Sequence, residues 1–174
     1  MLGLEHLTLN LLIDLGLPFL AVIFFMEGSL IGKMLPTDLL LIAAAVIFVT
    51  QTQYFYTVLA ITVTASTAGQ YWLFLRFEGK TVKDLHESGI IKLSDQNIDR
   101  MFTSLEKRGL KAVMFSNIIP GVRGLLTIPA AIEGFDRNKF VTASVVGTFM
   151  LHAVLIGLGS GMLTSVLESV NPVN

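Results

Sequence analysis

The sequence lacks cysteine and has few charged residues for its length. No cysteine occurs among its 174 residues, so disulfides, iron-sulfur clusters, thiol nucleophiles and the usual structural zinc sites are excluded. Charged residues make up 14% of the chain, whereas an average soluble domain has about 25%. The three histidines, His6, His86 and His152, are too scattered to indicate a metal site. We therefore expect neither a metal nor another cofactor.

Apolar residues and glycine are abundant instead. Hydrophobic residues make up 53% of the chain, the mean hydropathy is +0.71, and glycine occurs 15 times. Sustained apolar sequence is the signal of a membrane span, and glycine is more frequent in transmembrane helices than in soluble ones. The composition therefore predicts an all-α integral membrane protein and disfavours a soluble domain.

Three segments are predicted to form transmembrane helices. A full crossing needs about 20 residues at about 1.5 Å each. The run 54–75 meets this length without a formal charge, and 140–167 is uncharged apart from His152. Polar residues interrupt the segment 7–26, so we interpret it as an amphipathic lead-in followed by a short first span.

Small residues recur every four positions within both long runs. They are Ala60, Thr64 and Ala68 in the first run, and Ala153, Gly157 and Gly161 in the second. This spacing allows helix backbones to approach closely in lipid. We therefore expect both ladders to pack against neighbouring helices.

Two apolar segments, 27–50 and 110–133, are interrupted by proline, glycine and charged residues. Pro36 and Pro120 mark the breaks, because proline lacks a backbone donor and disfavours helix at the preceding residue. Broken backbone is tolerated at membrane depth only where protein or water covers it. We interpret both segments as re-entrant helical hairpins. Such segments in corresponding positions of two halves are typical of the substrate site of a secondary transporter.

The region 76–109 is polar and is predicted to contain an amphipathic helix. Ser94 is placed as its N-cap, and Gly109 follows two basic residues as its stop. Apolar residues recur between them at helical spacing: Ile98, Met101, Phe102 and Leu105. Their face is expected to lie on the membrane surface or on the helix bundle. A shorter preceding helix is expected to end at Gly89.

The distribution of basic residues predicts the orientation. Eight of the 12 lysines and arginines lie between residues 76 and 111, and basic loops are retained in the cytoplasm. The first hairpin then dips into the bilayer from outside and the second from the cytoplasm. This is an inverted-repeat arrangement in the plasma membrane of a prokaryotic cell.

Glu27, Asp38 and Arg123 carry the chemistry that we expect in these hairpins. An ionisable side chain at the centre of a membrane helix costs about 2.5–3.5 kcal/mol on insertion scales, so opposite charges are expected to meet in one watery cavity. The planar fork of arginine suits phosphate, which makes Arg123 the candidate anion-binding group. A carboxylate in such a cavity can take up and release a proton, which makes Glu27 or Asp38 the candidate coupling group.

Each of these residues also has a structural interpretation. Glu27 and Arg123 could form an ion pair that only holds the hairpins together, and Asp38 could cap the apolar helix that follows it. Asn117 could satisfy backbone groups at the break of the second hairpin. His152, within the last span, could relay protons or could pack as a hydrogen-bonded histidine.

The hairpin residues resemble two signatures of the DedA family, also called the VTT domain family. The first signature is a glutamate followed by Leu-Pro-Gly-Asp and an apolar helix. It resembles Glu27 and Leu35 to Asp38, with Thr37 in place of the glycine. The second signature, Arg-x-x-Pro-Gly-x-Arg, resembles the residues from Asn117 to Arg123, with Asn117 in place of the first arginine.

This resemblance implies two facing re-entrant hairpins and a role in moving polyprenyl-phosphate carriers or phospholipids between leaflets, with proton dependence. It makes Glu27, Asp38 and Arg123 functional positions. Asn117 and Gly121, which belong to the second signature, join Arg123 as candidate substrate-binding residues. The change at position 117 implies a different head group, a weaker hold on phosphate or altered coupling.

The resulting hypothesis is a flippase or scramblase that binds the anionic head group of a membrane lipid, with protons or sodium as coupling ions. Two alternatives stay open: a proton- or sodium-coupled exporter of small cations, and a scaffold that binds partner helices through Gly157 and Gly161. A homo-oligomer is also considered. An enzyme is not expected, because no nucleophile–base pair or metal-ligand cluster has the required spacing. Nucleic-acid binding is not expected, because acidic residues nearly balance the basic block.

Overall fold

The computed structural model describes residues 16–31, 37–48, 52–89, 94–119 and 123–170, and all regular structure in these ranges is helical. In chain order the helices are Gly16–Gly28, α2 (Thr37–Phe48), α3 (Thr52–Phe77), α4 (Val82–Ser88), α5 (Asp95–Arg108), α6 (Leu110–Ile118), α7 (Thr127–Ile132) and α8 (Arg137–Val170). The prediction of an all-α chain is therefore confirmed for the described residues.

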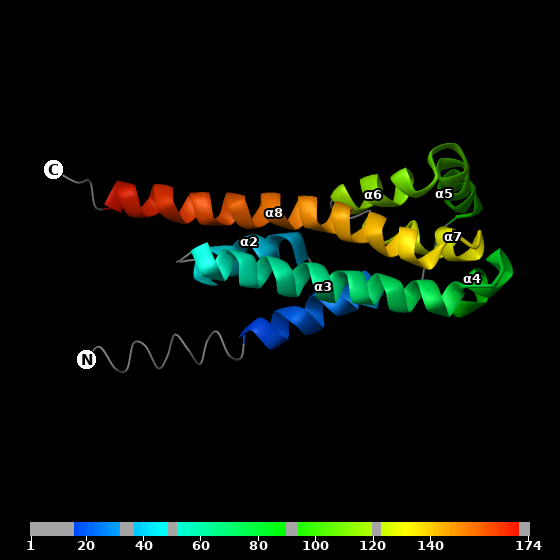
Figure 1. Cartoon of the computed structure of the whole chain (residues 1–174), viewed down its shortest axis with the longest axis horizontal. Coiled ribbons are helices and arrows are strands. Elements are labelled where there is room, and N and C mark those ends of the chain that lie inside the picture. The colour runs from blue at the N-terminus through cyan, green and yellow to red at the C-terminus, as the bar shows by residue number, and fades with distance from the viewer. Residues whose placement is uncertain (1–15, 32–36, 49–51, 90–93, 120–122, 171–174) are drawn as a thin grey trace.

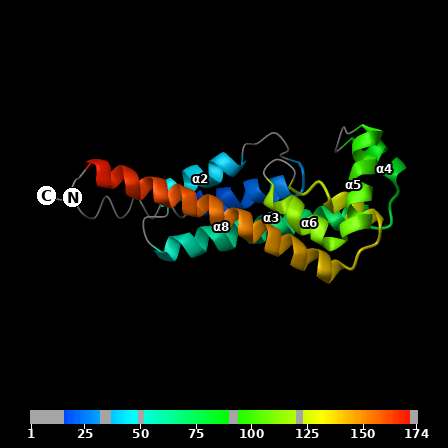
Figure 2. The ribbon, with the colours of Figure 1, turned by 90° about the horizontal axis from the view of Figure 1, so that it is seen from above.

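The long helices α3 and α8 form the axis of the molecule. They lie in contact and run in opposite directions, as Figures 1 and 2 show. The stretches Tyr54–Phe77 and Arg137–Gly161 are long and apolar enough to cross a membrane. Neither helix contains a proline, so nothing removes a backbone donor from their interior. The predicted runs 54–75 and 140–167 thus form continuous helices.

Two shorter helix pairs pack along this axis. The first pair is the helix Gly16–Gly28 with α2, and the second is α6 with α7. The two pairs approach from opposite ends of α3 and α8, and both turn back near the middle of the molecule (Figure 1). Helices α2 and α6 contact α8, whereas α7 contacts α3. The placement of these pairs in a membrane, as re-entrant hairpins, stays a prediction.

The first pair begins earlier in the chain than the sequence pattern predicted. Glu27 lies within the last turn of the helix Gly16–Gly28, and a turn over residues 29–31 follows. The segment 27–50 therefore contributes one described helix, α2. The other helix of the pair, Gly16–Gly28, lies mostly in the segment 7–26, which was predicted to contain the first span. Glutamate is a good helix former, so the charge of Glu27 alone did not mark the end of a helix. The beginning of the predicted segment 7–26 lies outside the described residues.

Helix α4 begins and ends with strong local signals. The hydroxyl of Thr81 accepts a hydrogen bond from the backbone N–H of Asp84, and the Asp84 carboxylate accepts one from the backbone N–H of Thr81 at 2.7 Å. This reciprocal capping box satisfies donors that the first turn of a helix leaves free. Gly89 ends the helix in the left-handed conformation, as predicted from the sequence.

Helix α5 packs its apolar face on the bundle. Ile98 and Leu105 are buried in the core cluster at this end of the molecule, and Met101 and Phe102 pack against it. Of the two placements left open by the sequence, the structure thus favours the bundle over the membrane surface. Ser94 occupies the N-cap position, as predicted, but its hydroxyl makes no capping hydrogen bond.

The buried apolar residues form two clusters separated by polar side chains. One cluster includes Phe74, Ile128 and Phe140, near α4 and α5. The other includes Phe24 and Leu155, where the first pair meets α3 and α8. Buried polar residues lie along the chain between the members of the two clusters: Thr37, Thr62, Ser66, Gln70, Asn117, Arg123, Ser144, Thr148 and His152. The interior of the bundle is therefore polar near its middle and apolar toward both ends.

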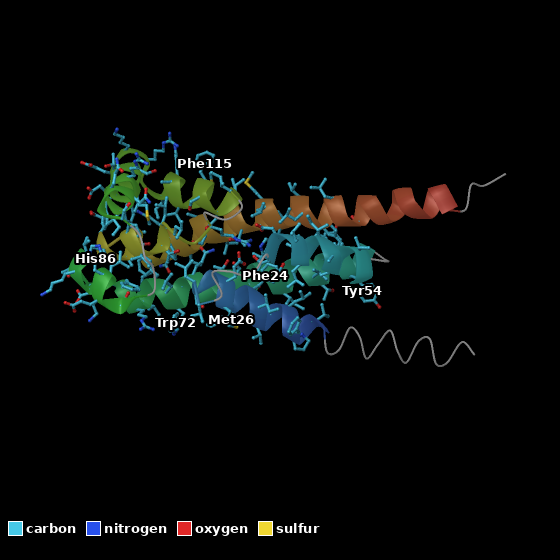
Figure 3. All side chains as sticks on the ribbon, turned by 180° about the vertical axis from the view of Figure 1, so that it is seen from behind. Phe24, Met26, Tyr54, Trp72, His86 and Phe115 are labelled. Atoms are coloured by element: carbon cyan, nitrogen blue, oxygen red, sulfur yellow. The ribbon has the colours of Figure 1, made fainter. Side chains whose placement is uncertain are left out.

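The outer surface carries many large apolar side chains. Trp72 and Phe115 lie on the outside of the bundle, whereas Phe24 points into its middle (Figure 3). Exposed phenylalanine, leucine and valine side chains also follow α8 on the side away from its partners. Extended apolar surface of this kind suits contact with lipid chains.

Most of the two predicted packing ladders lies on this outer surface, so the expectation of packing against neighbouring helices is wrong there, and only Ala153 packs against a core cluster. Ala60, Thr64 and Ala68 are exposed, and nothing lies within 4 Å of a Cβ added at Gly157 or Gly161. Close backbone approach occurs at other glycines. A Cβ at Gly69 would lie 2.2 Å from the carbonyl oxygen of Phe25, and one at Gly159 would lie 2.6 Å from that of Ile42. The four-residue spacing of small residues marked helices that can approach closely. It did not show which face of each helix makes the close contact.

Candidate functional site

Glu27, Asp38 and Arg123 meet in the middle of the bundle. The Nη2 group of Arg123 donates to the Glu27 carboxylate and lies 3.3 Å from Asp38 Oδ1. The Arg123 side chain is only 3% exposed, against 16% for Glu27 and 26% for Asp38. The structure therefore brings the predicted charged residues of both segments into one cluster, although their separation in the sequence is large.

Each member comes from the end of a helix, near one of the two turns. Glu27 lies in the last turn of Gly16–Gly28, and Asp38 in the first turn of α2. Helix α2 begins at Thr37, so Asp38 lies inside the helix and not at the N-cap position considered from the sequence. Thr37 accepts a further hydrogen bond from Arg123 Nη2 at 3.4 Å. Arg123 itself comes from the break between α6 and α7, next to Gly124, whose φ is 76°.

His152 is a member of the site that the sequence analysis did not include among the site residues. It is fully buried in α8, and its Nε2 atom contacts Nη1 of Arg123. Its Nδ1 atom lies 3.0 Å from the hydroxyl of Thr62, which in turn donates to the carbonyl oxygen of Val58 at 2.8 Å. The available signal was its spacing from Ser144 and Thr148, which places three polar residues on one face of α8.

These contacts define the protonation state of His152. Arginine has no acceptor, so Arg123 donates and Nε2 of His152 must accept. The ring is therefore neutral and carries its proton on Nδ1, which donates to Thr62. The hydroxyl hydrogen of Thr62 is left for Val58. Every donor in this chain of contacts has an acceptor, since Thr62 can also donate to the carbonyl oxygen of Leu59 at 3.3 Å, and the contact with His152 orients the guanidinium from the α8 side.

Asn117 supports the break of the second pair. Its side-chain Nδ2 donates to Oε1 of Gln70 at 3.0 Å, and its Oδ1 accepts from the backbone N–H of Gly124 at 3.1 Å. The side chain is completely buried. This matches the interpretation that Asn117 satisfies backbone groups at the break, and it leaves one amide hydrogen for any other partner. The other predicted residues of the breaks, Pro36, Pro120 and Gly121, lie outside the described residues.

The cluster contains more acidic than basic side chains. Two carboxyl groups face one guanidinium, and the neighbouring His152 ring is neutral. The Nε atom of Arg123 is buried and has no hydrogen-bond partner among the described residues. A guanidinium with a free donor, next to carboxylates that can be protonated, is suited to exchanging one anionic partner for another.

Comparison with known proteins identifies the family. The model of the VTT domain matches residues 35–161. Undecaprenyl phosphate transporter A of Staphylococcus aureus (strain NCTC 8325 / PS 47) is 35% identical over 69 residues, which are 40% of this chain and 34% of that protein. The alkaline phosphatase-like proteins of Lactococcus lactis subsp. cremoris (strain MG1363) and subsp. lactis (strain IL1403) are 26% and 27% identical over 90 residues, which are 48% of this chain and 42% of theirs.

The aligned regions cover less than half of the length of each of these relatives. No solved structure matches the chain. The match to the family model begins at Leu35, within the first signature and after Glu27, and extends through most of α8, so it includes Asp38, Asn117, Arg123 and His152. On this match the chain belongs to the VTT domain family of membrane proteins, the DedA family.

Proposed function

We propose that this protein moves an anionic lipid between the two leaflets of the plasma membrane. Arg123 would hold the phosphate of the head group while the isoprenoid or acyl tail stays in the bilayer. The observation that carries the proposal is the guanidinium of Arg123 held between two carboxylates in the middle of an apolar bundle. The substrate would be a phosphorylated isoprenoid or a phospholipid, and the name of the Staphylococcus aureus relative supports the first of these.

The charge of the cluster would couple binding of the head group to protonation of a carboxylate. A phosphate that approached Arg123 would also approach Glu27 and Asp38, and like charges at short range disfavour one another. Protonation of a carboxylate removes part of this repulsion and frees the guanidinium for bidentate pairing with phosphate. Proton uptake and anion binding therefore favour each other, and release of one favours release of the other.

The exposure of the site supports entry from the carboxylate side. Asp38 and Glu27 are more exposed than Arg123, so a head group would meet them first. The large apolar side chains on the outside of the bundle would contact the lipid tail throughout the movement. The protein then needs to shelter only a polar head group, which suits a chain of this size.

In this proposal the two helix pairs are re-entrant hairpins that dip into the bilayer from opposite faces. Their approach from opposite ends of α3 and α8 supports this arrangement (Figure 1). Helices α4 and α5 would lie in the cytoplasm, because eight of the 12 lysines and arginines lie between residues 76 and 111. Arg123 would then lie near the bilayer midplane, where transporters built from broken helices bind their substrates.

We propose transport and not hydrolysis of the phosphate, although two relatives are named alkaline phosphatase-like. Arg123 contacts Glu27, Asp38, Thr37 and His152, and exchanging some of these partners for a phosphate would be enough to bind and release a head group. Hydrolysis would in addition require a nucleophile, or a water molecule, held in line with the phosphorus atom by a base. Release of inorganic phosphate from the lipid, measured in parallel with its movement, would contradict this assignment.

The test is a leaflet-exchange assay in proteoliposomes that contain undecaprenyl phosphate or phosphatidylglycerol. Arg123→Lys should lower the exchange rate by at least about tenfold, because an ammonium cannot bridge two partners as the guanidinium fork does. Arg137→Lys, at an exposed ion pair, is the matched control and should keep the rate. Wild-type protein that moves neither lipid, in vesicles where another family member is active, would overturn the proposal.

Export of a small cation is the second candidate, and the excess of acidic over basic side chains in the cluster favours it. The carboxylates of Glu27 and Asp38 would then bind the cation, and Arg123 would only hold them in place. The two candidates differ in their response to Arg123→Lys, since a structural positive charge survives this change largely intact. Sodium-dependent cation flux that persists in Arg123→Lys, without lipid exchange in the wild type, would establish the exporter.

A further inference from the structure

The face that joins α3 to α8 contains a continuous row of buried polar residues. Two contacts define how the helices align: Thr62 with His152, and the ring of Phe74 with that of Phe140, whose centroids are 4.5 Å apart. Between these contacts, each step of four residues along α3 corresponds to four residues back along α8. Ser66 then lies level with Thr148, and Gln70 with Ser144. We call these six polar residues the seam: Thr62, Ser66, Gln70, Ser144, Thr148 and His152.

The seam is buried and contains polar atoms without partners. All six residues are fully buried. The hydroxyls of Ser66, Ser144 and Thr148 and the Nε2 atom of Gln70 have no hydrogen-bond partner among the described residues. Leaving several such groups unsatisfied in an apolar bundle is costly, so native proteins pair them with protein groups or with ordered water.

Among the described residues, five buried hydroxyls have no hydrogen-bond partner, and three of them, those of Ser66, Ser144 and Thr148, belong to the seam; the other two are those of Thr67 and Thr127. Serine and threonine in helices commonly donate to a carbonyl oxygen three or four residues earlier in their own helix. Thr62, Ser116 and Thr142 do so here, at 2.8 to 2.9 Å. Ser66 and Thr148, on the same two long helices, point elsewhere. Their hydroxyls are thus available to a partner that lies between the helices.

The seam reaches the charged cluster at one end. His152 contacts Arg123 directly, and Gly28, the residue after Glu27, packs against the backbone of Ser66. A Cβ at Gly28 would lie 2.1 Å from the Ser66 carbonyl oxygen, so the two backbones are as close as glycine permits. The charged or titratable groups of the described residues at this end are Glu27, Asp38, Arg123 and His152.

An aromatic layer closes the other end of the seam. Phe74 and Phe140 are both completely buried and lie one helical turn beyond Gln70 and Ser144. One turn further, Glu78 and Arg137 form an exposed ion pair at 2.6 Å, near α4 and α5. The two rings, with the apolar cluster to which they belong, therefore separate the buried polar row from the charged end of the molecule. Apolar constrictions of this kind close water-filled paths by excluding water.

We propose that the seam is a hydrated proton path between the charged end of the molecule and the carboxylate of Glu27, and that Phe74 and Phe140 form the barrier that closes it. Water molecules would pair with Ser66, Thr148, Ser144 and Gln70, and each can both donate and accept. The inference deepens the proposed function, because the proton that it delivers is the one exchanged with the anionic head group.

The proton transfer leaves no charge in the seam. Each water molecule or hydroxyl accepts a proton on the side of Glu78 and releases one on the side of Glu27, so it ends neutral. One proton leaves bulk water at the charged end, and the Glu27 carboxylate becomes a neutral carboxyl. The amide of Gln70 positions water without carrying a proton. His152 can receive a proton on Nε2 only if Arg123 first moves away, since that atom accepts from the guanidinium.

Hydration of the seam can be tested without transport, because the chain contains no cysteine. Ser66→Cys and Ser144→Cys place a thiol of similar size in the seam. Val63→Cys and Ala131→Cys are the controls, since both positions are buried in the apolar clusters. The reagent is Ag⁺, which is small enough for a narrow path, and unreacted thiols are counted with a maleimide after denaturation. Seam cysteines should react at least about tenfold faster than the controls, because a thiol ionises only where water reaches it.

The barrier is tested in the same assay. Phe140→Ala in the Ser144→Cys protein should increase the rate of reaction with Ag⁺ again, whereas Phe115→Ala, on the outer surface, should not change it. Equal rates for the seam and the control cysteines would overturn the proposal. An unchanged rate after Phe140→Ala would overturn the role of the rings.

A double variant, Ser66→Ala with Thr148→Val, tests proton conduction directly. Removing hydroxyls without protein partners should leave the thermal unfolding midpoint unchanged or raise it. Proton uptake into vesicles with an internal pH-sensitive dye should fall at least about tenfold, because the row of donors and acceptors is broken. If the seam cysteines react but the wild type moves no lipid, the proposed function fails and the seam stands. If lipid moves and the seam cysteines do not react, the seam alone fails.

Discussion

The inner and outer faces of α3 and α8 have opposite character. The inner faces carry Ser66, Thr148 and His152, all completely buried, whereas Trp72 and Val154 lie on the outer faces, Val154 with 59% of its surface exposed. A soluble helix bundle shows the reverse pattern. In lipid, helices associate through close packing and interhelical hydrogen bonds, because burying apolar surface from hydrocarbon gains nothing. This reversal is what places a charged cluster inside so small a protein.

The largest difference is expected between leucine substitutions at two glycines on opposite faces of α8. Gly159→Leu should prevent α2 from packing on α8 and lower the free energy of unfolding by at least about 3 kcal/mol, since overpacking against backbone cannot be relieved. Gly157→Leu meets open space and should leave the fold intact. The measurement is the folded fraction after detergent extraction, followed by thermal unfolding. Destabilisation by Gly157→Leu, with a change in oligomeric state, would show that the outer face binds a second copy.

The next largest difference is expected between leucine substitutions at His152 and Val154, which lie on the same helix. His152→Leu removes the acceptor for Arg123 and leaves a charged donor buried, which should cost about 1–3 kcal/mol of stability and most of the lipid exchange. Val154→Leu should change neither, because its side chain faces outward. The two variants are compared by thermal unfolding and by leaflet exchange. Full activity in His152→Leu would show that the guanidinium is positioned by the carboxylates alone.

A smaller effect is expected at the break of the second pair. Asn117→Ala removes two hydrogen bonds and leaves the backbone N–H of Gly124 without its partner. The cost should be about 2 kcal/mol, with a matching loss of activity as Arg123 loses its fixed position. Ser160→Ala, at an exposed hydroxyl that bonds within its own helix, is the control and should have little effect. Unaltered thermal unfolding of Asn117→Ala would contradict this support role.

The smallest effect concerns the exposed ion pair at the charged end. The hydrogen bonds from Arg137 hold the pKa of Glu78 below its usual value. The stability that this pair contributes is therefore present above the unfolded pKa of glutamate and is lost as the pH falls through the lower, folded value. Glu78→Gln should remove this acid-dependent part of the thermal unfolding profile and leave the midpoint at neutral pH nearly unchanged. A large change at neutral pH would show that the pair holds α8 in place.

The predicted helices were correct where the physical signal is local. Uninterrupted apolar runs gave α3 and α8, and the left-handed glycine after Ser88 ended α4 as expected. The boundary predicted at Glu27 was wrong, because glutamate is a good helix former and its charge does not end a helix. The pattern also could not show that Arg123, almost a hundred residues later in the chain, pairs with it. The ladders failed for a related reason, since four-residue spacing marks a face without showing what lies against it.

The sequence by itself determined that this chain is apolar and helical, that two segments are broken, and that each broken segment contains charged residues. The tertiary structure decided which residues meet those charges. It placed His152 beside Arg123 and Thr62 beside His152, paired the Asn117 side chain with the backbone N–H of Gly124, and left Gly157 on the outer surface. Local pattern follows from backbone geometry and apolarity, whereas these contacts follow from the register in which separate helices pack.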